Sequence, residues 1–560
     1  MLASGVAELF SLGAVLPFLA VFDDPERLWQ QPLIQSLAAQ LGLTEASQLF
    51  LPATLTFAAA AVTAAVIRLM NLWLNGRLAA AVGSDLSCEA YLRTLYKPYG
   101  LHVQHNSAAV ITGATTHIAK TVAALNSLLQ LTTSAVVAAG LLTGLLLIDA
   151  PVAVASAALF GSAYSILAIT ARRELLLNSR LIADASTQQL KALQEGLGAI
   201  RDVLLDGSQH IYIQIYREAD RPLRQLGAKN NFLAVFPRYA LEALGMVSIA
   251  LLGWLLAVQR GSGVSVIPLL GSLALGAQRL LPALQQIYGG WASLKGYNAE
   301  IQSVLAMLNY PMPRVVNDIQ PLPLLEGVSL TGVHFRYDQK ESDVLKGLDL
   351  TIQRGERIGL IGGTGSGKST TADLIMGLLV PTTGRVMVDG KDLHDPAHIE
   401  RLTAWRAAIA HVPQSIYLAD SSFAENIAFG VHRNQIDLAR VMKAAEQAQI
   451  SSFIESNPDG YYSLVGEQGI RLSGGQRQRI GIARALYKQA RVLIFDEATS
   501  ALDTTTEDAV MAAVEALSKD LTIVMIAHRL STVQRCDRVI LLAQGFVAAD
   551  GPPATVINNL

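Results

Sequence analysis

A glycine-rich segment in the C-terminal half of the chain has the residue types and spacing of a phosphate-binding loop. It follows the strand-like apolar run 357–361 and precedes the helix-like run 370–376. Glycines let the backbone curl so that successive N–H groups converge on a phosphate at a helix N-terminus. The lysine can then reach the β- and γ-phosphates, and the following serine can ligate Mg²⁺. The residues expected to contact a nucleotide here are Gly362, Gly363, Thr364, Gly365, Ser366, Gly367, Lys368, Ser369 and Thr370.

A second chemical element is a pair of carboxylates at the end of an apolar run. Residues 492–495 read Val-Leu-Ile-Phe, which is typical of a buried parallel strand, and Asp496 and Glu497 follow directly. Parallel sheets bind ligands at the carboxyl ends of their strands. We expect Asp496 to hold Mg²⁺ and Glu497 to polarise the attacking water, since phosphoryl transfer depends mainly on positioning and charge stabilisation. The alternative is a core strand followed by a helix-capping acid.

With these segments the chain resembles the ATP-binding cassette (ABC) superfamily. Five further matches occur in the family's order between about residues 325 and 550: the adenine-stacking Tyr337, the Q-loop Gln414, the signature 472–476, the D-loop 500–503 and the switch His528. The resemblance implies that Gln414 and His528 act with Glu497 in hydrolysis, and that Gln414 joins Ser369 and Asp496 around Mg²⁺. It also implies that Tyr337, Ser473, Gly474, Gly475, Gln476 and Asp503 contact ATP.

The signature also has a direct physical interpretation. Ser473-Gly474-Gly475 precedes a helix-like stretch, 476–484, that carries several basic residues. Free N–H groups and the positive dipole end of a helix attract anions. One nucleotide cannot easily occupy two anion sites of one domain. The family solves this by clamping ATP between two subunits, so the resemblance implies a dimer. No motif is degenerate, which favours a homodimer over a heterodimer.

Composition points to a membrane protein. Of 560 residues, 16% are charged and mean hydropathy is +0.36, whereas soluble domains average about 25% charged residues. Lys+Arg 43 against Asp+Glu 45 leaves no basic excess, so a nucleic-acid partner is not indicated. Cys88 and Cys536 lie in different halves of the chain, and a disulfide framework is not expected.

Six stretches without Asp, Glu, Lys or Arg predict membrane spans. Most are long enough to cross about 30 Å of hydrocarbon at about 1.5 Å per residue. Polar stretches 84–120 and 172–230 carry many Lys and Arg, whereas the expected outer loops offer mainly Arg27 and Arg260. This asymmetry predicts a cytoplasmic nucleotide-binding domain and, with the family, a bacterial inner-membrane location. The six stretches are 9–22, 46–67, 121–148, 150–171, 243–259 and 261–278.

The predicted fold is an α-helical six-span transmembrane domain fused to an α/β P-loop ABC nucleotide-binding domain. The transmembrane domain is expected at 1–308, a proline-rich linker at 309–324 and the nucleotide-binding domain at 325–560. This order is similar to the half-transporters of type IV exporters. That class docks short coupling helices onto its nucleotide-binding domains, and the stretches 102–109 and 207–216 are candidates here.

The N-terminal region suggests a substrate class. The first span is short, with Glu8 inside it, and is expected to be truncated; the loop 23–48 carries a helical apolar stripe. With residues 11–19, this loop is similar to flippases of polyprenyl-diphosphate-linked oligosaccharides, which carry an external helix there. A surface helix that only shields the outer mouth is the alternative.

Arginines in or near apolar helices are the candidate substrate residues. An arginine at bilayer depth costs several kcal/mol unless it faces water or a partner. We expect Arg68, Arg238 and Arg279 to line a cavity that binds a phosphate or pyrophosphate head group; solvated helix extensions are the alternative. The expected activity is ATP-driven flipping of an amphipathic, anionic lipid-linked substrate from the inner to the outer leaflet by alternating access. Multidrug or peptide export, an ATP-gated channel and a soluble ABC ATPase are the competing interpretations.

Overall fold

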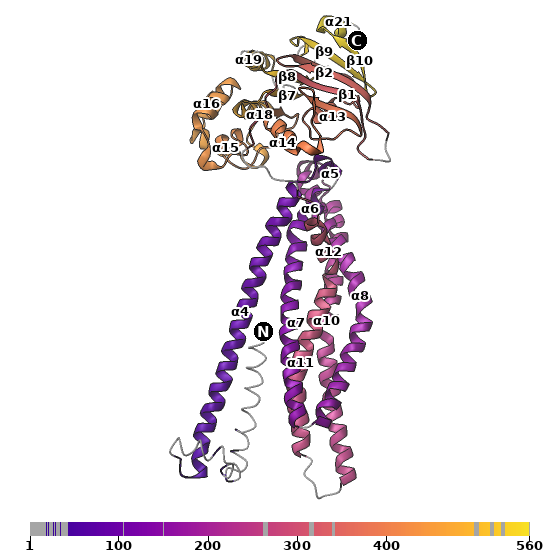
Figure 1. Cartoon of the computed structure of the whole chain (residues 1–560), viewed down its shortest axis with the longest axis vertical. Coiled ribbons are helices and arrows are strands. Elements are labelled where there is room, and N and C mark those ends of the chain that lie inside the picture. The colour runs from indigo at the N-terminus through magenta and orange to yellow at the C-terminus, as the bar shows by residue number, and fades with distance from the viewer. Residues whose placement is uncertain are drawn as a thin grey trace. The chain divides into compact units, whose positions relative to one another are not determined.

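A computed structural model gives the arrangement of the chain (Figure 1). It describes residues 43–560 except 105, 149, 261–266, 313–318, 339–341, 498–502, 516–519, 528–532 and 559–560, and a few isolated residues before 43. The described chain divides into a helical unit, residues 1–97 and 105–313, and an α/β unit, residues 98–104 and 314–560. The expected first span and most of the loop 23–48 lie outside the described residues.

Long helices dominate the helical unit. Four of the predicted spans lie wholly or almost wholly in α4, α7, α8 and α10, and α11 contains most of the sixth, 261–278. Two candidate spans, Phe50–Leu95 and Ser107–Gly144, combine sufficient length with high hydropathy in the part of the chain that is described. The elements are α4 (Phe50–Leu95), α6 (Ser107–Thr112), α7 (Ile118–Ile148), α8 (Ala150–Gly198), α9 (Ile200–Leu205), α10 (Gln209–Arg260), α11 (Ile267–Gly296) and α12 (Asn298–Leu308), with short turns η1 (Ala46–Leu49) and η2 (Gly113–His117).

Helices α7, α8, α10 and α11 run side by side as a bundle (Figure 1). Polar groups inside it are satisfied by neighbouring helices: the Tyr288 hydroxyl donates to the Leu233 carbonyl at 3.1 Å, and the Tyr164 hydroxyl donates to Gln285 Oε1 at 3.0 Å. A Cβ at Gly290 would lie 2.9 Å from the Ser127 carbonyl oxygen, so glycine permits the close approach of α11 to α7. Buried hydrogen bonds of this kind fix helix register where apolar packing alone is permissive.

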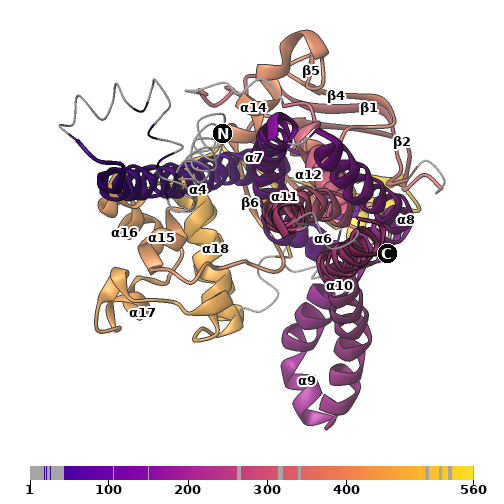
Figure 2. The ribbon, with the colours of Figure 1, turned by 90° about the horizontal axis from the view of Figure 1, so that it is seen from below.

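Both α8 and α10 extend well past their apolar stretches, and the short helix α9 joins them at the tip of the resulting hairpin (Figure 2). The 49 residues of α8 and 52 of α10 exceed the roughly 20 needed to span hydrocarbon. The second candidate coupling stretch, 207–216, is corrected by the structure. The short helix is α9, and most of 207–216 forms the first turns of α10, because its Tyr and Ile residues continue the helical pattern.

Two sheets form the α/β unit. A four-stranded antiparallel sheet has the order β2-β1-β4-β5, and a six-stranded sheet has the order β10-β9-β3-β8-β7-β6. In the larger sheet β6, β7, β8, β3 and β9 are parallel, and β10 is antiparallel to β9. The strands are β1 (Gly327–Phe335), β2 (Leu345–Gln353), β3 (Arg357–Ile361), β4 (Thr383–Val388), β5 (Lys391–Asp392), β6 (Ile409–Val412), β7 (Val492–Asp496), β8 (Thr522–Ile526), β9 (Arg538–Ala543) and β10 (Phe546–Gly551).

Helices flank these sheets and complete the cores. The fully buried Trp405 anchors one of them, because its indole N–H donates to the Ile375 carbonyl at 2.7 Å and so fixes the C-terminal end of α13. The helices are α5 (Tyr99–Gln104), α13 (Lys368–Ile375), α14 (Ile399–Ala408), α15 (Phe423–Ile427), α16 (Leu438–Gln447), α17 (Ser451–Glu455), α18 (Gly474–Lys488), α19 (Thr504–Glu515) and α21 (Pro553–Ile557), with short turns η4 (Pro396–His398), η5 (Arg433–Gln435), η6 (Gly460–Tyr462) and η7 (Glu467–Gly469).

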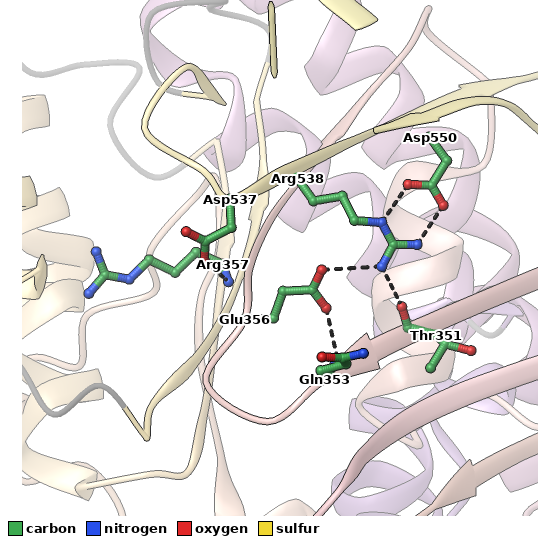
Figure 3. Close-up of polar contacts among 7 residues, drawn as sticks. All are labelled: Thr351, Gln353, Glu356, Arg357, Asp537, Arg538 and Asp550. Carbon is green, nitrogen blue, oxygen red and sulfur yellow. Dashed lines mark hydrogen bonds and ion pairs between the residues drawn. The ribbon is translucent and has the colours of Figure 1, made fainter. Parts of the chain in front are cut away.

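Arg538 joins the two sheets behind the strand that carries the glycine-rich loop (Figure 3). Its guanidinium donates to both Asp550 oxygens at 2.5 Å, to Glu356 at 3.2 Å and to the Thr351 carbonyl at 3.0 Å. These bonds connect β9, β10, β2 and the turn before β3, and the two carboxylates raise the pKa of Arg538 above its ordinary value. Charge-assisted and bidentate bonds are the stronger hydrogen bonds in proteins, so this cluster holds the start of β3 in place.

Candidate active site

The glycine-rich loop lies between β3 and α13, as predicted. Gly362, Gly365 and Gly367 have φ of 146°, 77° and 103°, values that L side chains rarely adopt. A Cβ at Gly362 would lie 2.1 Å from the Leu542 carbonyl oxygen, and one at Gly367 would lie 2.6 Å from the Leu345 side chain. Glycine is therefore required both for the turn and for its packing against β9 and β2.

Lys368 and Ser366 show that this loop is shaped for an anion. The Lys368 ammonium donates to the carbonyls of Gly362 and Gly363 at 2.8 and 3.0 Å, which curls the loop around it. Burial lowers the pKa of Lys368, while Glu497 and Asp496 oppose that shift. The Ser366 hydroxyl is buried and has no hydrogen-bond partner among the described residues. A loop with a buried ammonium and an unsatisfied hydroxyl at the start of a helix fits a polyphosphate.

Tyr337, the predicted adenine-stacking residue, lies beside this loop. Its hydroxyl and the Thr370 hydroxyl are 3.2 Å apart, and its ring packs edge-on against Phe335 with centroids 5.0 Å apart. The hydrogen bond connects the predicted base site with the first turn of α13. The ring is thus held by contacts on two sides at one end of the phosphate loop.

Two of the residues predicted to act in hydrolysis, Gln414 and Glu497, lie together at the carboxyl edge of the larger sheet. Glu497 follows β7 and Gln414 follows β6, its parallel neighbour. The Gln414 amide donates to the Glu497 carboxylate at 2.7 Å. Glu497 itself has φ of 50°, and its backbone N–H donates to the Ile526 carbonyl of β8 at 2.9 Å. A non-glycine residue in left-handed backbone is uncommon and needs such support. The carboxylate is therefore positioned by both neighbouring strands.

The signature residues form the start of α18. The Ser473 hydroxyl accepts from the Gln476 N–H at 3.2 Å, and the Gln476 side chain accepts from the Ser473 N–H at 2.8 Å. This reciprocal capping box fixes the helix N-terminus. Ser473 is exposed, and Gly474 and Gly475 are half-buried. The dipole end of α18 is thus preformed at the surface of the subunit.

The structure describes only part of two predicted site segments, the D-loop and the switch region. Asp503 is exposed at the start of α19, where its carbonyl accepts from the Glu507 N–H at 2.8 Å. Residues 500–502 of the expected D-loop and the switch residue His528 lie outside the described residues. Their proposed roles remain predictions.

The predicted substrate arginines are separated along the helical unit. Arg68 of α4 lines a cavity of about 370 Å³ with residues of α7 and α11. Arg238 is exposed on α10, 6.0 Å from the ring of the adjacent Tyr239. Arg279 lies in α11, but its side chain is outside the described residues. The structure therefore places Arg68, and not Arg238, at a described cavity.

Residues 98–104 belong to the α/β unit, and this segment overlaps the start of the candidate coupling stretch 102–109. The Gln104 side chain of α5 donates to the Tyr337 carbonyl at 2.6 Å, and a Cβ at Gly100 would contact Leu379 at 3.8 Å. The candidate coupling stretch 102–109 is divided between the two units: α5 ends at Gln104 in the α/β unit, and α6 begins at Ser107 in the helical unit. Local sequence does not predict which residues make this contact, because Gln104 and Tyr337 are 233 positions apart.

Asp373 is a further residue that the motifs do not include. It lies on α13, four residues after Ser369 and so on the same face of the helix. Burial, and secondarily Asp496, raises its pKa to about 6. Asp373 in turn contributes, after burial, to the raised pKa of Tyr99 in α5. Asp373 follows the predicted Mg²⁺ ligand Ser369 by four residues, and this helical spacing is the sequence signal that could have identified Asp373.

The raised pKa of Asp373 makes a testable prediction. The pKa of Asp373 is about 6 in the folded state and near 4 in the unfolded chain. Its neutral form therefore stabilises the fold fully below pH 4, and this contribution is lost as pH rises through 6. Asp373→Asn should therefore unfold at a higher temperature than wild type at pH 8, and the difference should shrink towards pH 5. Thermal unfolding of nucleotide-free protein measures it. The exposed Asp420→Asn is the control; an equal pH dependence there would contradict the assignment.

Known proteins match this chain over most of its length. Residues 345–500 match the family described as ABC transporter. The ATP-dependent lipid A-core flippase of Chromohalobacter salexigens is 32% identical over 469 residues, 83% of this chain and 79% of that protein. That of Chromobacterium violaceum is 43% identical over 254 residues, 45% of this chain and 42% of that protein. A solved structure described as a bacterial Atm1-family ABC exporter with ATP bound has 25% identity and a TM-score of 0.79, and the match covers 98% of this chain and 96% of that one.

A similarity over 83% of the chain includes the long apolar helices as well as the ATP-binding unit. It therefore reflects more than an ATPase domain shared with soluble proteins. The apolar helices make the chain an integral membrane protein, and the P-loop unit makes it an ATPase that drives transport. The chain belongs to the ABC transporter family and has the fold of an ABC exporter.

Proposed function

We propose that two copies of this chain form one transporter that flips an anionic, lipid-linked substrate across the membrane. Each ATP would be held between the phosphate loop of one copy and the signature helix of the other. The exposed, preformed N-terminus of α18 supports this arrangement, since a helix end of this kind attracts anions. A homodimer is the simplest assembly, because every motif is intact in this chain; pairing with an unlike chain is the alternative.

Mg²⁺ would be held by Ser369, Gln414 and Asp496. The Ser369 side chain is exposed in the first turn of α13, and Asp496 ends β7. When bound, the ion neutralises charge on the phosphates. Glu497 would orient and deprotonate the attacking water, and its hydrogen bond to Gln414 keeps the carboxylate at the sheet edge. The amide of Gln414 thus connects the metal site with the base.

One cavity in the helical unit carries the substrate proposal. Around Arg68 it is lined by amides and hydroxyls of α4, α7 and α11, and no carboxylate is among its described lining residues. The Ser134 hydroxyl donates to Gln286 at 2.5 Å, which connects α7 and α11 beside the arginine. A cation with several amides between apolar helices suits a phosphate or pyrophosphate group. The polar lining residues are Arg68, Asn71, Asn75, Gln130, Thr133, Ser134 and Gln286.

The lipid identity is proposed from two sources. Relatives that cover most of the chain are named lipid A-core flippases. The N-terminal segment 11–48 resembles flippases of polyprenyl-diphosphate-linked oligosaccharides. The substrates named for these two groups of flippases are both glycans attached to a lipid. We propose a lipid-linked oligosaccharide as the substrate of this chain. The Lys and Arg excess in 84–120 and 172–230 supports a bacterial inner-membrane location with the α/β unit in the cytoplasm.

Reconstituted transport tests this proposal. Purified protein in liposomes should move a polyprenyl-diphosphate-linked oligosaccharide between leaflets in an ATP-dependent manner, and the same lipid should stimulate ATP hydrolysis. A neutral dye-labelled phosphatidylcholine and a hydrophobic drug serve as competing substrates. Transport of the drug or of the neutral lipid at the same rate, with no response to the diphosphate lipid, would reject the anionic-lipid assignment and favour multidrug export.

The contact of α5 with the nucleotide unit predicts a coupling residue. Gln104 bonds the backbone of Tyr337, the proposed adenine-stacking residue, so α5 can follow movements at the base site. Gln104→Ala should reduce substrate-stimulated ATPase and transport by about fivefold to tenfold, since one hydrogen bond contributes about 1 kcal/mol, while basal ATPase stays near wild type. Side-by-side transport and phosphate-release assays measure the ratio. The exposed Gln435→Ala is the control, and an equal loss in basal ATPase would show a merely structural role.

A further inference from the structure

The helical unit contains a second, larger cavity. Its volume is about 540 Å³, and its walls come from η2, α7, α8, α10, α11 and α12. None of its described lining residues also lines the cavity around Arg68. The two cavities are therefore separate sites within one subunit.

Several residues that line this cavity lie past the ends of the charge-free stretches of their helices. Ser186 lies about 15 residues past the charge-free stretch 150–171, which is roughly 22 Å at the rise of an α-helix. Lys120 precedes the stretch 121–148, which is itself longer than the roughly 20 residues needed to span. The helix α12, which ends the helical unit, packs against α7, α8 and η2, the elements that carry these residues and His117. Its charged lining residues, Lys120, Arg224 and Glu300, suit a water-soluble ligand better than a lipid chain.

Hydrogen-bond donors face the cavity. The Lys120 ammonium lies 5.0 Å from the ring centroid of Tyr297, and both residues line the walls. Asn230 accepts through Oδ1 from Asn178 at 2.8 Å, which leaves its amide nitrogen as a donor 3.5 Å from the position of a Cβ on Gly296. These two donors come from different helices, α7 and α10, and line the same cavity.

His117 is the independent sign that a ligand is expected. Its side chain is only 6% exposed and lines the cavity. Nδ1 contacts the Ser303 hydroxyl at 2.9 Å, whereas Nε2 is buried and has no hydrogen-bond partner among the described residues. A buried ring nitrogen without a hydrogen-bond partner destabilises the folded chain. A bound polar molecule would remove this destabilisation.

The acidic groups near the cavity are already engaged. Glu300 is 1% exposed at the start of α12 and accepts from the Ser179 hydroxyl at 3.2 Å; burial raises its pKa, which favours the neutral form. Asp220 accepts from Gln189 at 2.6 Å and from Arg224 at 3.2 Å. Lys120 opposes the raised pKa of Glu300. The described lining carries two cations, Lys120 and Arg224, against one carboxylate, Glu300, and this balance favours an anionic ligand.

We propose that this cavity binds a small water-soluble anion, a phosphate or a carboxylate, through Lys120, His117 and Asn230. The anion would bridge η2, α7 and α10 and so favour one arrangement of these helices. This is a binding site separate from the proposed lipid cavity, and its existence does not depend on which lipid is transported. A lipid head group offers the same phosphate chemistry, and the experiment separates the two sources.

Titration calorimetry with inorganic phosphate tests the site. The full chain is used in nanodiscs of phosphatidylcholine, in a Lys368→Ala background that weakens phosphate binding at the nucleotide loop. Saturable binding is expected. It should weaken at least tenfold in Lys120→Gln and in Asn230→Asp; the second variant retains an acceptor for Asn178 and adds a negative charge. Lys191→Gln, an exposed residue paired with Glu195 on α8, is the matched control and should bind as the parent does.

Three outcomes would overturn the proposal. The first is no saturable binding in the parent, and the second is an equal loss in Lys191→Gln, which would indicate a diffuse charge effect. The third uses nanodiscs that contain phosphatidylglycerol: if this anionic lipid abolishes phosphate binding at constant ionic strength, the occupant is a head group and not a dissolved anion. Retained binding in both nanodiscs, with the loss confined to Lys120→Gln and Asn230→Asp, supports it.

Discussion

Glu497→Gln should lower the rate of ATP hydrolysis by at least about a hundredfold while ATP still binds, because general-base catalysis contributes about 10²–10⁴ in rate. The substitution preserves the shape of the side chain and its contact with Gln414 but removes the group that takes a proton from water. The phosphate loop is unchanged, so nucleotide affinity should persist. ATP should then hold two copies together, since the nucleotide stabilises the closed state and is no longer consumed.

Phosphate release and size-exclusion chromatography with Mg²⁺ and ATP measure the two effects. The variant should be nearly inactive and should keep a compact, ATP-dependent dimer of its α/β units. Glu455→Gln, at the exposed end of α17, is the control and should hydrolyse normally. Near-normal turnover in Glu497→Gln would show that another group is the base.

Arg68→Ala should reduce transport of a diphosphate-linked lipid by about tenfold to a hundredfold, since a hydrogen bond to a charged group contributes about 1.5–3 kcal/mol. Basal ATPase should remain, because Arg68 is in the helical unit and the hydrolytic residues are in the other. Arg68→Lys should retain part of the activity: it keeps the charge but loses bidentate bonding to a phosphate. The position of Arg68 among amides of α4 and α7 is the basis of this expectation.

A flip assay in proteoliposomes, with ATPase measured on the same samples, tests the role of Arg68. Arg77 provides a matched control on the same helix: its guanidinium lies over the Trp73 ring at 4.9 Å and does not line the cavity. Arg77→Ala should transport normally. Unchanged transport in Arg68→Ala, with ATPase intact, would remove the arginine from the substrate site.

Local sequence predicted the phosphate loop, the carboxylate strand and the signature helix with nearly correct boundaries. The predicted strand 357–361 is β3, and α18 begins at Gly474 after a Ser473–Gln476 capping box. These features depend on glycine conformations, strand hydrophobicity and helix caps, which act over a few residues. Charge-free stretches likewise predicted where the long helices lie, because a bilayer excludes charged side chains over a known length.

Contacts between distant residues could not be predicted in the same way. Gln414 and Glu497 are separated by 83 positions, Gln104 and Tyr337 by 233. The short helix between α8 and α10 is at 200–205 and not within 207–216, because helical periodicity does not show where a long helix starts. Asp373 has an ordinary position in a helix, and only burial beside Asp496 shifts its pKa.

The amino-acid sequence by itself determined that the chain has a nucleotide loop, a carboxylate pair and helices of bilayer length, since each depends on neighbouring residues. Tertiary structure alone decided which side chains meet. It brought Gln414 to Glu497 by pairing β6 with β7, joined α5 to the nucleotide unit, and left two separate polar cavities among the helices. The physical reason is that apolar periodicity fixes which face of a helix is buried, whereas packing and hydrogen bonds between distant elements select its partner.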